Sequence, residues 1–231
     1  MHRRARREWR RRSLRALRSL REKEHPPFRG ITLWAELPHG RAGSILGRTL
    51  CAHRGGAVEY YVRPATYADV PAIGRVARET WRTTYAHTIA PHNQQRVLER
   101  SYADAALAAA LQMAQSWFFV AVNGEEVLGF AQFMCRGDGH GELVRIYVLP
   151  AHQRQGIGRA LLQAGVRAMA AVGIHRCYVS VEVDNVPAIA FYQHFGFRYH
   201  RAYASFVGDQ LVHLLELKTS LRALRYALET E

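Results

Sequence analysis

Residues 153–158 read Gln-Arg-Gln-Gly-Ile-Gly, and they stand between a predicted strand that ends at Pro150 and a predicted helix that begins at Gly158. A helix start presents backbone N–H groups that have no partner inside the helix, and the aligned peptide dipoles attract anions to it. Glycine lacks a Cβ atom, so phosphate oxygens can approach the backbone at positions 156 and 158. Arg154 and Arg159 add positive charge beside the turn. The stretch therefore predicts a phosphate-binding turn.

Two other phosphate-binding motifs do not match this stretch. A Walker A loop requires Gly-Lys followed by Ser or Thr, whereas Gly158 is followed by Arg159 and Ala160. A dinucleotide-binding fingerprint requires a small residue three positions after the second glycine, and that position holds Leu161. Both motifs are therefore excluded.

Hydrophobic periodicity and turn residues predict an α/β sandwich with a mostly antiparallel sheet. Asp69 is expected to cap the first helix, Asn123-Gly124 to form a hairpin turn, and residues 136–141 to form a Gly-rich loop. A helical region is expected after Pro91, including the Ala-rich stretch 103–114. The other predicted helices are 158–172, 187–195 and 221–228, and the predicted strands are 60–62, 117–122, 127–134, 143–149, 177–183, 197–206 and 211–217.

A second motif follows, because residues 185–197 read Asn-Val-Pro-Ala-Ile-Ala-Phe-Tyr-Gln-His-Phe-Gly-Phe. Together with Ile146-Tyr147-Val148 and the 153–158 turn, its order and spacing resemble the GNAT superfamily of N-acetyltransferases. The resemblance covers residues 59–218 and is strongest over 142–197, whereas residues 1–58 match nothing in the family. It implies a mixed, mostly antiparallel central sheet with helices on both faces and a splayed parallel strand pair that binds acyl-CoA.

The resemblance also implies the ligand contacts. Acetyl-CoA is the expected co-substrate, with its pantetheine arm along strand 143–149 and Tyr192 beside the thioester sulfur. The implied acyl-CoA contacts are Tyr147, Val148, Gln153, Arg154, Gln155, Gly156, Ile157, Gly158, Arg159, Asn185 and Tyr192. For Asn185, a second role as the cap of the helix that Pro187 begins is equally compatible.

The chemistry of amide formation assigns roles to particular side chains. A primary amine with a pKa of about 10.4 must lose a proton before it attacks a thioester, and a carboxylate can accept that proton. Glu142 is the leading candidate for this base, and His140 and Glu182 are weaker ones. Tyr192 is the candidate general acid, since a departing thiolate benefits from a proton donor. Each of these side chains could instead be structural: an aromatic in a packed helix for Tyr192, an exposed strand end for Glu142.

The acceptor is less well defined. Trp81 and Tyr85, near the end of the first helix, are placed where this family builds its acceptor wall, although helical spacing makes a core role equally compatible. The chain looks similar to a bacterial group that includes polyamine acetyltransferases, and Glu79, Glu142 and Asp209 could supply acids to a polyamine pocket. A peptide N-terminus or another small-molecule amine stays open as the acceptor. The competing hypothesis is a non-catalytic acyl-CoA-binding regulatory module.

Composition and charge separate the chain into two parts. Of its 231 residues 48% are hydrophobic and 22% charged, which is ordinary for a globular protein. Residues 1–58 contain 15 Lys and Arg against 4 Asp and Glu, so they carry most of the net charge of +13. They are expected to form an Arg-rich disordered tail and linker, followed by an acetyltransferase domain at 59–218 and a C-terminal helical tail at 219–231. The tail could be a nucleic-acid or membrane-surface arm, a solvated segment without a role, or an over-long start to a protein that begins near Val58.

The three cysteines favour a reducing, cytoplasmic setting. Cys51, Cys135 and Cys177 are odd in number and widely spaced, which argues against a disulfide framework and structural zinc. No metal and no membrane partner are expected, nucleic acid is expected only through the tail, and a homodimer stays open.

Overall fold

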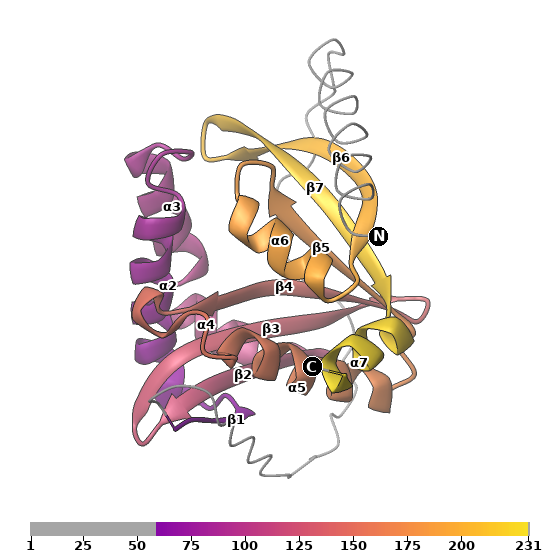
Figure 1. Ribbon diagram of the computed structural model, residues 1–231. Coiled ribbons are helices and arrows are strands. Elements are labelled where there is room, and N and C mark those ends of the chain that lie inside the picture. The colour runs from indigo at the N-terminus through magenta and orange to yellow at the C-terminus, as the bar shows by residue number, and fades with distance from the viewer. Residues whose placement is uncertain (1–58, 231) are drawn as a thin grey trace.

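A seven-stranded sheet organises residues 59–230, the part of the chain that the computed structural model describes (Figure 1). The predicted tail, residues 1–58, lies outside the described residues. The strands are β1 (Tyr61–Pro64), β2 (Ser116–Asn123), β3 (Glu126–Gly137), β4 (His140–Val148), β5 (Arg176–Glu182), β6 (Arg198–Val207) and β7 (Gln210–Ser220). The helices are α2 (Val70–Thr84), α3 (Pro91–Ser101), α4 (Asp104–Gln112), α5 (Ile157–Ala171), α6 (Val186–His194) and α7 (Leu221–Glu229).

The strand order is β1-β2-β3-β4-β5-β7-β6, and every neighbouring pair is antiparallel except β4 and β5. This mixed sheet, with helices packed against it, confirms the predicted fold class. The single parallel pair is formed because α5 crosses over between β4 and β5, whereas the remaining neighbours are hairpins or longer returns.

The parallel pair is joined only over its first part. The ladder runs from His140 opposite Arg176 to Leu143 opposite Val179 and stops there, although β4 continues to Val148. A bulge accompanies the separation, because the β3–β4 register shifts between Gln132 and Phe133. The two strands therefore diverge beyond this point, as predicted for a splayed pair.

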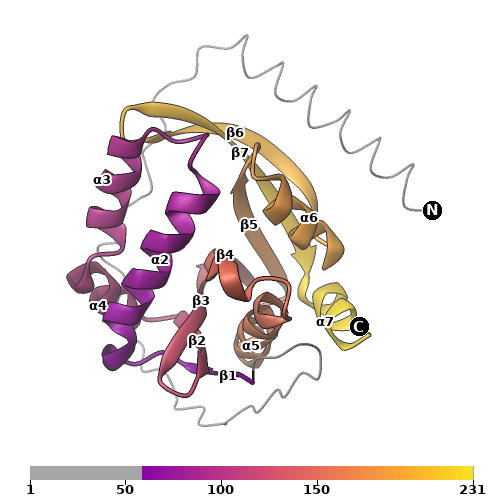
Figure 2. The same ribbon diagram turned by 60° about the vertical axis from the view of Figure 1, so that its left-hand side comes forward.

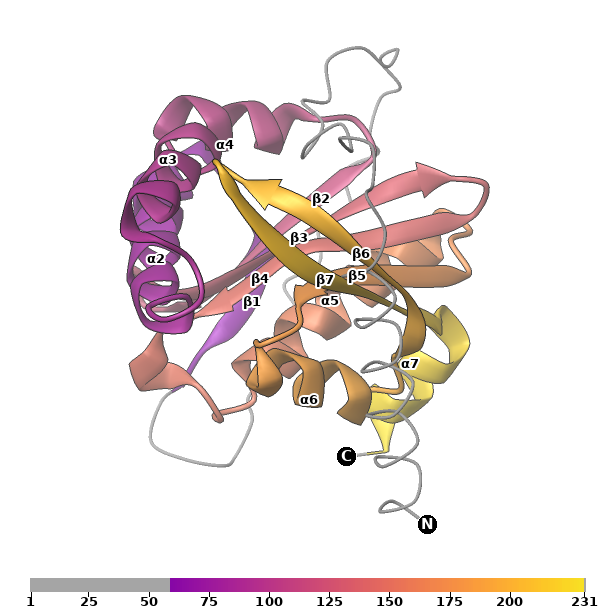
Figure 3. The same cartoon turned by 90° about the horizontal axis from the view of Figure 1, so that it is seen from above.

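The helices form two groups, which Figures 2 and 3 show from different sides. One core lies between the sheet and α5, α6 and α7, and its fully buried members include Phe133 and Leu161. The other lies between the sheet and α2 and α4, and it includes Ile73 and Phe130. Since α2 buries Ile73, Val76 and Ala77 with no exposed area, its amphipathic pattern directs one face to this second core.

Several elements differ from the sequence-based expectation. The predicted 136–141 loop is mostly strand, because β3 extends to Gly137 and β4 begins at His140. The helical region after Pro91 is divided into α3 and α4. Asp69 precedes α2, but its carboxylate accepts hydrogen bonds from Arg63 and Thr66 instead of from the helix amides.

The C-terminal helix is part of the core. Leu221, Leu224 and Leu228 on α7 are at most 3% exposed and belong to the same cluster as α5. The helix predicted as a tail over 219–231 therefore packs against the domain. None of the helices in residues 59–230 is long and apolar enough to cross a membrane.

Candidate active site

A cavity of about 1060 Å³ opens where β4 and β5 separate. Residues 144–148 of β4 and 179–182 of β5 form two of its sides. The other sides come from α2, the turn before α5, α6 and the β6–β7 hairpin. The cavity thus collects segments that are far apart in the sequence.

The separated strands leave a free edge along the cavity. β4 pairs with β3 on its other edge up to Val148, and β5 pairs with β7 throughout. Beyond Leu143 the backbone groups of β4 that face β5 therefore have no strand partner. An extended ligand with amide groups can bond to such an edge in the way that a strand does. Tyr147 and Val148, both predicted as contacts, line this part of the cavity.

The turn before α5 is shaped by two residues with left-handed backbone. Arg154 has φ +62° and Gly156 has φ +81°. The first intrahelical bond runs from the Ala160 amide to the Gly156 carbonyl, so the preceding amides of the first turn stay available at the helix end. Of the predicted contacts, the cavity is lined by Gln153, Arg154, Gly156, Gly158 and Arg159.

The remaining two predicted contacts in this turn do not line the cavity. Ile157 is 1% exposed and packs in the core beside α5. The Gln155 side-chain amide donates to the Ala151 carbonyl at 3.2 Å. Gly158 has a packing role that the sequence did not indicate, because a Cβ atom there would lie 3.2 Å from the Phe191 ring.

Arg159 connects the turn to the end of the chain's last helix. Its guanidinium donates a hydrogen bond of 2.6 Å to the Leu228 carbonyl in the last turn of α7. A cation is stabilised at a helix C-terminus by the exposed carbonyls there. The position of the Arg159 side chain beside the turn therefore depends on α7.

Tyr192 is placed on α6 with its side chain at the cavity and 7% exposed. Asn185 caps this helix by accepting a hydrogen bond from the Ala188 amide at 3.2 Å, and it also lines the cavity. Burial raises the pKa of the Tyr192 phenol, and the nearby Tyr85 and Cys177 raise it further. The hydroxyl therefore keeps its proton at neutral pH and can act as a donor.

Aromatic side chains of α2 and β4 also line the cavity. The Trp81 indole N–H donates to the Tyr147 hydroxyl at 3.2 Å, and the rings of Trp81 and Tyr85 lie 4.5 Å apart. The Tyr102 hydroxyl also donates to that of Tyr147, at 3.3 Å. Burial raises the pKa of Tyr85 to about 12. Trp81 is thus both a core residue and a cavity residue, and Tyr85 lines the cavity beside it.

The acids that the sequence favoured are not in the cavity. Glu142 lies in the joined part of the parallel pair, opposite Tyr178, and its carboxylate pairs with Arg136 at 2.9 Å. Burial raises the pKa of Glu142, whereas Arg136 lowers it. Glu79 is exposed on α2, and Asp209 bonds to Asn93. His140 lies beside His175 and Tyr178, also outside the cavity. The structure therefore gives no geometric support to Glu142 as the base.

Glu182 is the acid that the structure brings to the cavity. It ends β5, is 8% exposed and lines the cavity, and its Oε2 atom has no hydrogen-bond partner among the described residues. Burial raises its pKa and the neighbouring charge of Asp184 raises it further, whereas contacts with the Thr88 side chain and the Asp184 backbone lower it. Asp184 lines the cavity as well. Sequence reasoning ranked Glu182 below Glu142, because the point at which β4 and β5 part is not visible in either strand alone.

Comparisons with known proteins agree with this geometry. The model of the protein family described as "Acetyltransferase (GNAT) family" matches residues 76–197 of this chain. The uncharacterized N-acetyltransferase YuaI of Bacillus subtilis is 36% identical over 138 residues, which cover 57% of this chain and 76% of that protein. The spermidine N(1)-acetyltransferase of Thermoplasma acidophilum is 26% identical, with 59% and 87% covered. The mycothiol acetyltransferase of Paenarthrobacter aurescens is 31% identical over 52% of this chain, which spans only 38% of that relative's length.

A solved structure shows the same fold. The crystal structure of the PaiA N-acetyltransferase from Thermoplasma acidophilum, in complex with coenzyme A, superposes with a TM-score of 0.61 at 23% identity. The match covers 69% of this chain and 99% of that chain. Among residues 59–230, no three His, Cys, Asp or Glu side chains are grouped so that they could hold a metal ion.

Proposed function

Because the chain belongs to the acetyltransferase (GNAT) family and is an acetyl-CoA-dependent N-acetyltransferase, we propose that it acetylates a small primary amine by direct attack, with Tyr192 as general acid and Glu182 as general base. No covalent enzyme intermediate is required. The single observation that carries this proposal is that one cavity holds the free edge of β4, the phosphate-binding turn, Tyr192 and Glu182 together.

The residues present fit acetyl-CoA. The turn at 153–159 offers helix-end amides and the Arg154 and Arg159 side chains, which suit a diphosphate. The unpaired edge of residues 144–148 suits the amides of a pantetheine arm. When bound, acetyl-CoA supplies an activated acetyl group on a thioester. The unpaired edge of β4, the turn before α5 and the cavity residues of α2 and α6 would hold this ligand.

Glu182 is suited to accept the proton of the incoming ammonium. Its Oε2 atom is buried and without a partner among residues 59–230, so an amine could donate to it. Its raised pKa makes its carboxylate a stronger base than that of an ordinary glutamate. A buried carboxylate without a cation is also costly, and a cationic acceptor would offset that cost.

Tyr192 is suited to protonate the leaving sulfur. A tyrosine phenol, with an ordinary pKa of about 10, is protonated at neutral pH, and burial raises the pKa of Tyr192 further. Asn185 fixes the first turn of the helix that carries it. A thiol with a pKa of about 8.5 leaves more readily when a proton is delivered to it. The products are then the amide and free coenzyme A.

The acceptor side of the cavity combines acid and apolar surface. Glu182 and Asp184 supply the negative charge, and the apolar contacts come from Trp81, Ile89, Phe206, Val207, Val212 and Leu214. A primary amine on an alkyl chain matches both. A linear polyamine is one member of this class, and the similarity to a spermidine N(1)-acetyltransferase favours it.

The test is an acceptor screen with acetyl-CoA in which release of free thiol is followed. We expect release that depends on both enzyme and a primary amine. Calorimetric binding of coenzyme A without turnover of any amine would contradict the proposal and favour the non-catalytic acyl-CoA-binding module.

A further inference from the structure

The helix α7 lies beside the phosphate-binding turn without forming part of the cavity. None of its residues 221–229 lines the cavity. Its buried leucines share one core with α5, and Figure 2 shows the two helices next to each other. Any influence of α7 on the ligand must therefore pass through a side chain that does line the cavity.

Arg159 is such a side chain, and its own helix does not favour its position. It is the third residue of α5, which begins at Ile157. The aligned peptide dipoles of a helix favour anions at its start and disfavour cations there. The first turn, Ile-Gly-Arg-Ala, contains no acid that would offset this effect. The guanidinium therefore needs a partner from outside α5.

The last turn of α7 supplies that partner. Arg159 donates a hydrogen bond of 2.6 Å to the Leu228 carbonyl. Residues 226–229 include no basic residue of their own, so the cation at this helix end comes from α5. Without it, the exposed carbonyls of α7 would lie beside the turn and repel a bound phosphate. One contact thus both neutralises the end of α7 and holds the arginine.

The Leu228 carbonyl is itself held in place. The Leu228 side chain is 2% exposed in the core. The amide and the hydroxyl of Thr230 donate to the Tyr226 carbonyl at 3.1 Å and 2.9 Å, which closes the last turn. At the other end, the Ser220 side chain caps α7 by accepting from the Ala223 amide at 3.2 Å. The acceptor that meets Arg159 is therefore a fixed one.

We propose that α7 is a positioning element of the donor site: the Leu228 carbonyl holds the Arg159 guanidinium at the turn, so that a diphosphate meets a cation that is already oriented. The inference rests on the proposed function, because the diphosphate is that of acetyl-CoA. An oriented cation raises affinity by lowering the entropy lost on binding. The role of α7 therefore concerns coenzyme A affinity and the KM for acetyl-CoA, while kcat is unaffected.

The variant Glu229→Pro moves the carbonyl and keeps the side chains of Arg159 and Leu228. Proline disfavours the helical conformation of the residue before it, so the Leu228 carbonyl turns away. Glu229→Ala is the matched control, because it loses only the exposed ion pair with Arg225. In calorimetry with coenzyme A, Glu229→Pro should weaken binding by about fivefold and Arg159→Ala by about tenfold. Glu229→Ala should bind as wild type does.

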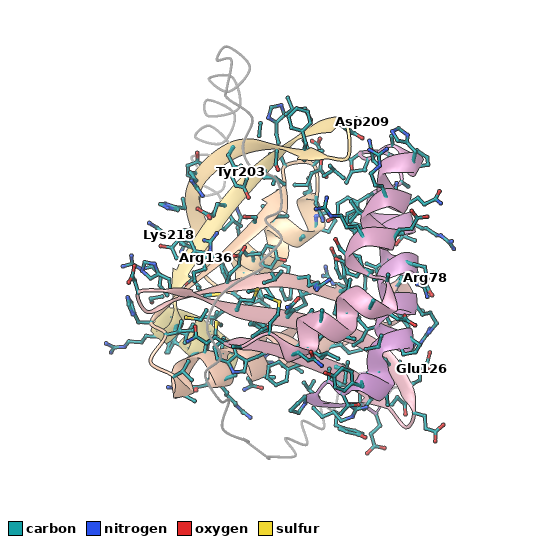
Figure 4. The ribbon with its side chains drawn as sticks, turned by 180° about the vertical axis from the view of Figure 1, so that it is seen from behind. Arg78, Glu126, Arg136, Tyr203, Asp209 and Lys218 are labelled. Carbon is teal, nitrogen blue, oxygen red and sulfur yellow. The ribbon has the colours of Figure 1, made fainter. Side chains whose placement is uncertain are left out.

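The combined variant separates an effect through Arg159 from a general loss of structure. If α7 acts through this arginine, Glu229→Pro causes no further loss of affinity in the Arg159→Ala background. Arg78→Ala controls for the loss of one positive charge, because Arg78 is exposed on α2 and outside the cavity (Figure 4). In the acetylation assay, kcat of Glu229→Pro should equal that of wild type while the KM for acetyl-CoA rises.

The outcomes distinguish the inference from the function that it rests on. Unchanged affinity in Glu229→Pro, or an equal loss with and without Arg159, would overturn the role of α7 and leave the proposed function standing. A wild type that does not bind coenzyme A would overturn both. Thermal melting shows whether Glu229→Pro is folded. If it is not, Leu228→Ala, which loosens the last turn by removing a buried side chain, takes its place in the same comparison.

Discussion

Replacing Glu182 by glutamine keeps the size of the side chain and removes its charge. Because the carboxylate is proposed to accept the amine proton, kcat/KM should fall by about 100-fold to 10,000-fold, the usual contribution of a general base. In wild type, kcat/KM should fall as the pH falls through the raised pKa of Glu182, since only the ionised form is a base. The variant should lack this acid limb.

The same substitution should stabilise the fold at pH 7. A carboxyl group whose pKa is raised by folding holds its proton more tightly in the folded state. It therefore costs nothing below its unfolded pKa, and its cost develops as the pH rises from the unfolded pKa to the raised folded pKa and is fully present above it. Each unit of increase corresponds to about 1.4 kcal/mol at pH 7, which for a domain of this size is about 3–5 °C in Tm. Glu182→Gln removes this cost, so activity and stability should change in opposite directions.

The assays are thiol release between pH 5 and pH 9 and thermal or denaturant unfolding at two pH values. Glu126→Gln is the control, because Glu126 is an exposed acid remote from the cavity, 3.6 Å from Arg75. If Glu182→Gln retains wild-type kcat/KM and the same acid limb, Glu182 is not the base. A loss of stability at pH 7 would show instead that the carboxylate has a stabilising partner in solution.

Three other substitutions test the remaining parts of the site. Tyr192→Phe should lower kcat by about 10-fold to 100-fold with coenzyme A affinity unchanged in calorimetry; lost affinity with a normal rate would contradict the acid role. Gly156→Val should weaken coenzyme A binding by about tenfold, because a β-branched residue is strained at φ +81°, and unchanged binding would show that the turn tolerates another backbone. Gly165→Ala should lower stability by about 1–3 kcal/mol in denaturant unfolding, since its Cβ would overlap the Phe133 ring, and an unaltered midpoint would show that α5 can shift.

Features that depend only on residues close together in the sequence were predictable. The left-handed backbone at Gly156 and the cap at Asn185 are local requirements, so the turn before α5 and the start of α6 could be located by residue number. The resemblance to the GNAT family predicted that Tyr192 lies beside the ligand, and Tyr192 lines the cavity. The predicted hairpins and crossovers were sufficient to predict the mostly antiparallel sheet.

Features that depend on the register between strands were not predictable. The bulge at Val144 changes which face of the sheet the β4 side chains occupy: Leu143 packs on the α5 side, whereas Arg145 donates to the Ser101 carbonyl on the other side. Glu142 lies in the paired part of β4 and β5 and is outside the cavity, whereas Glu182 lies where the strands have diverged and lines the cavity. The Asn93 side chain donates to the Asp209 carboxylate across more than a hundred residues of chain, and neither side chain is unusual in its own segment.

The hydrogen bond from Arg159 to the Leu228 carbonyl connects the turn before α5 to α7, an element outside the acceptor side of the cavity. Affinity for acetyl-CoA and choice of amine therefore depend on different elements. On the proposed function, changes in the last turn of α7 would tune the KM for acetyl-CoA through this arginine, without contact with the ligand. Changes to the cavity-lining residues of the β6–β7 hairpin would alter which amine is accepted. Because the two adjustments fall on different elements, mutation could move the enzyme to a new acceptor while its donor affinity is preserved.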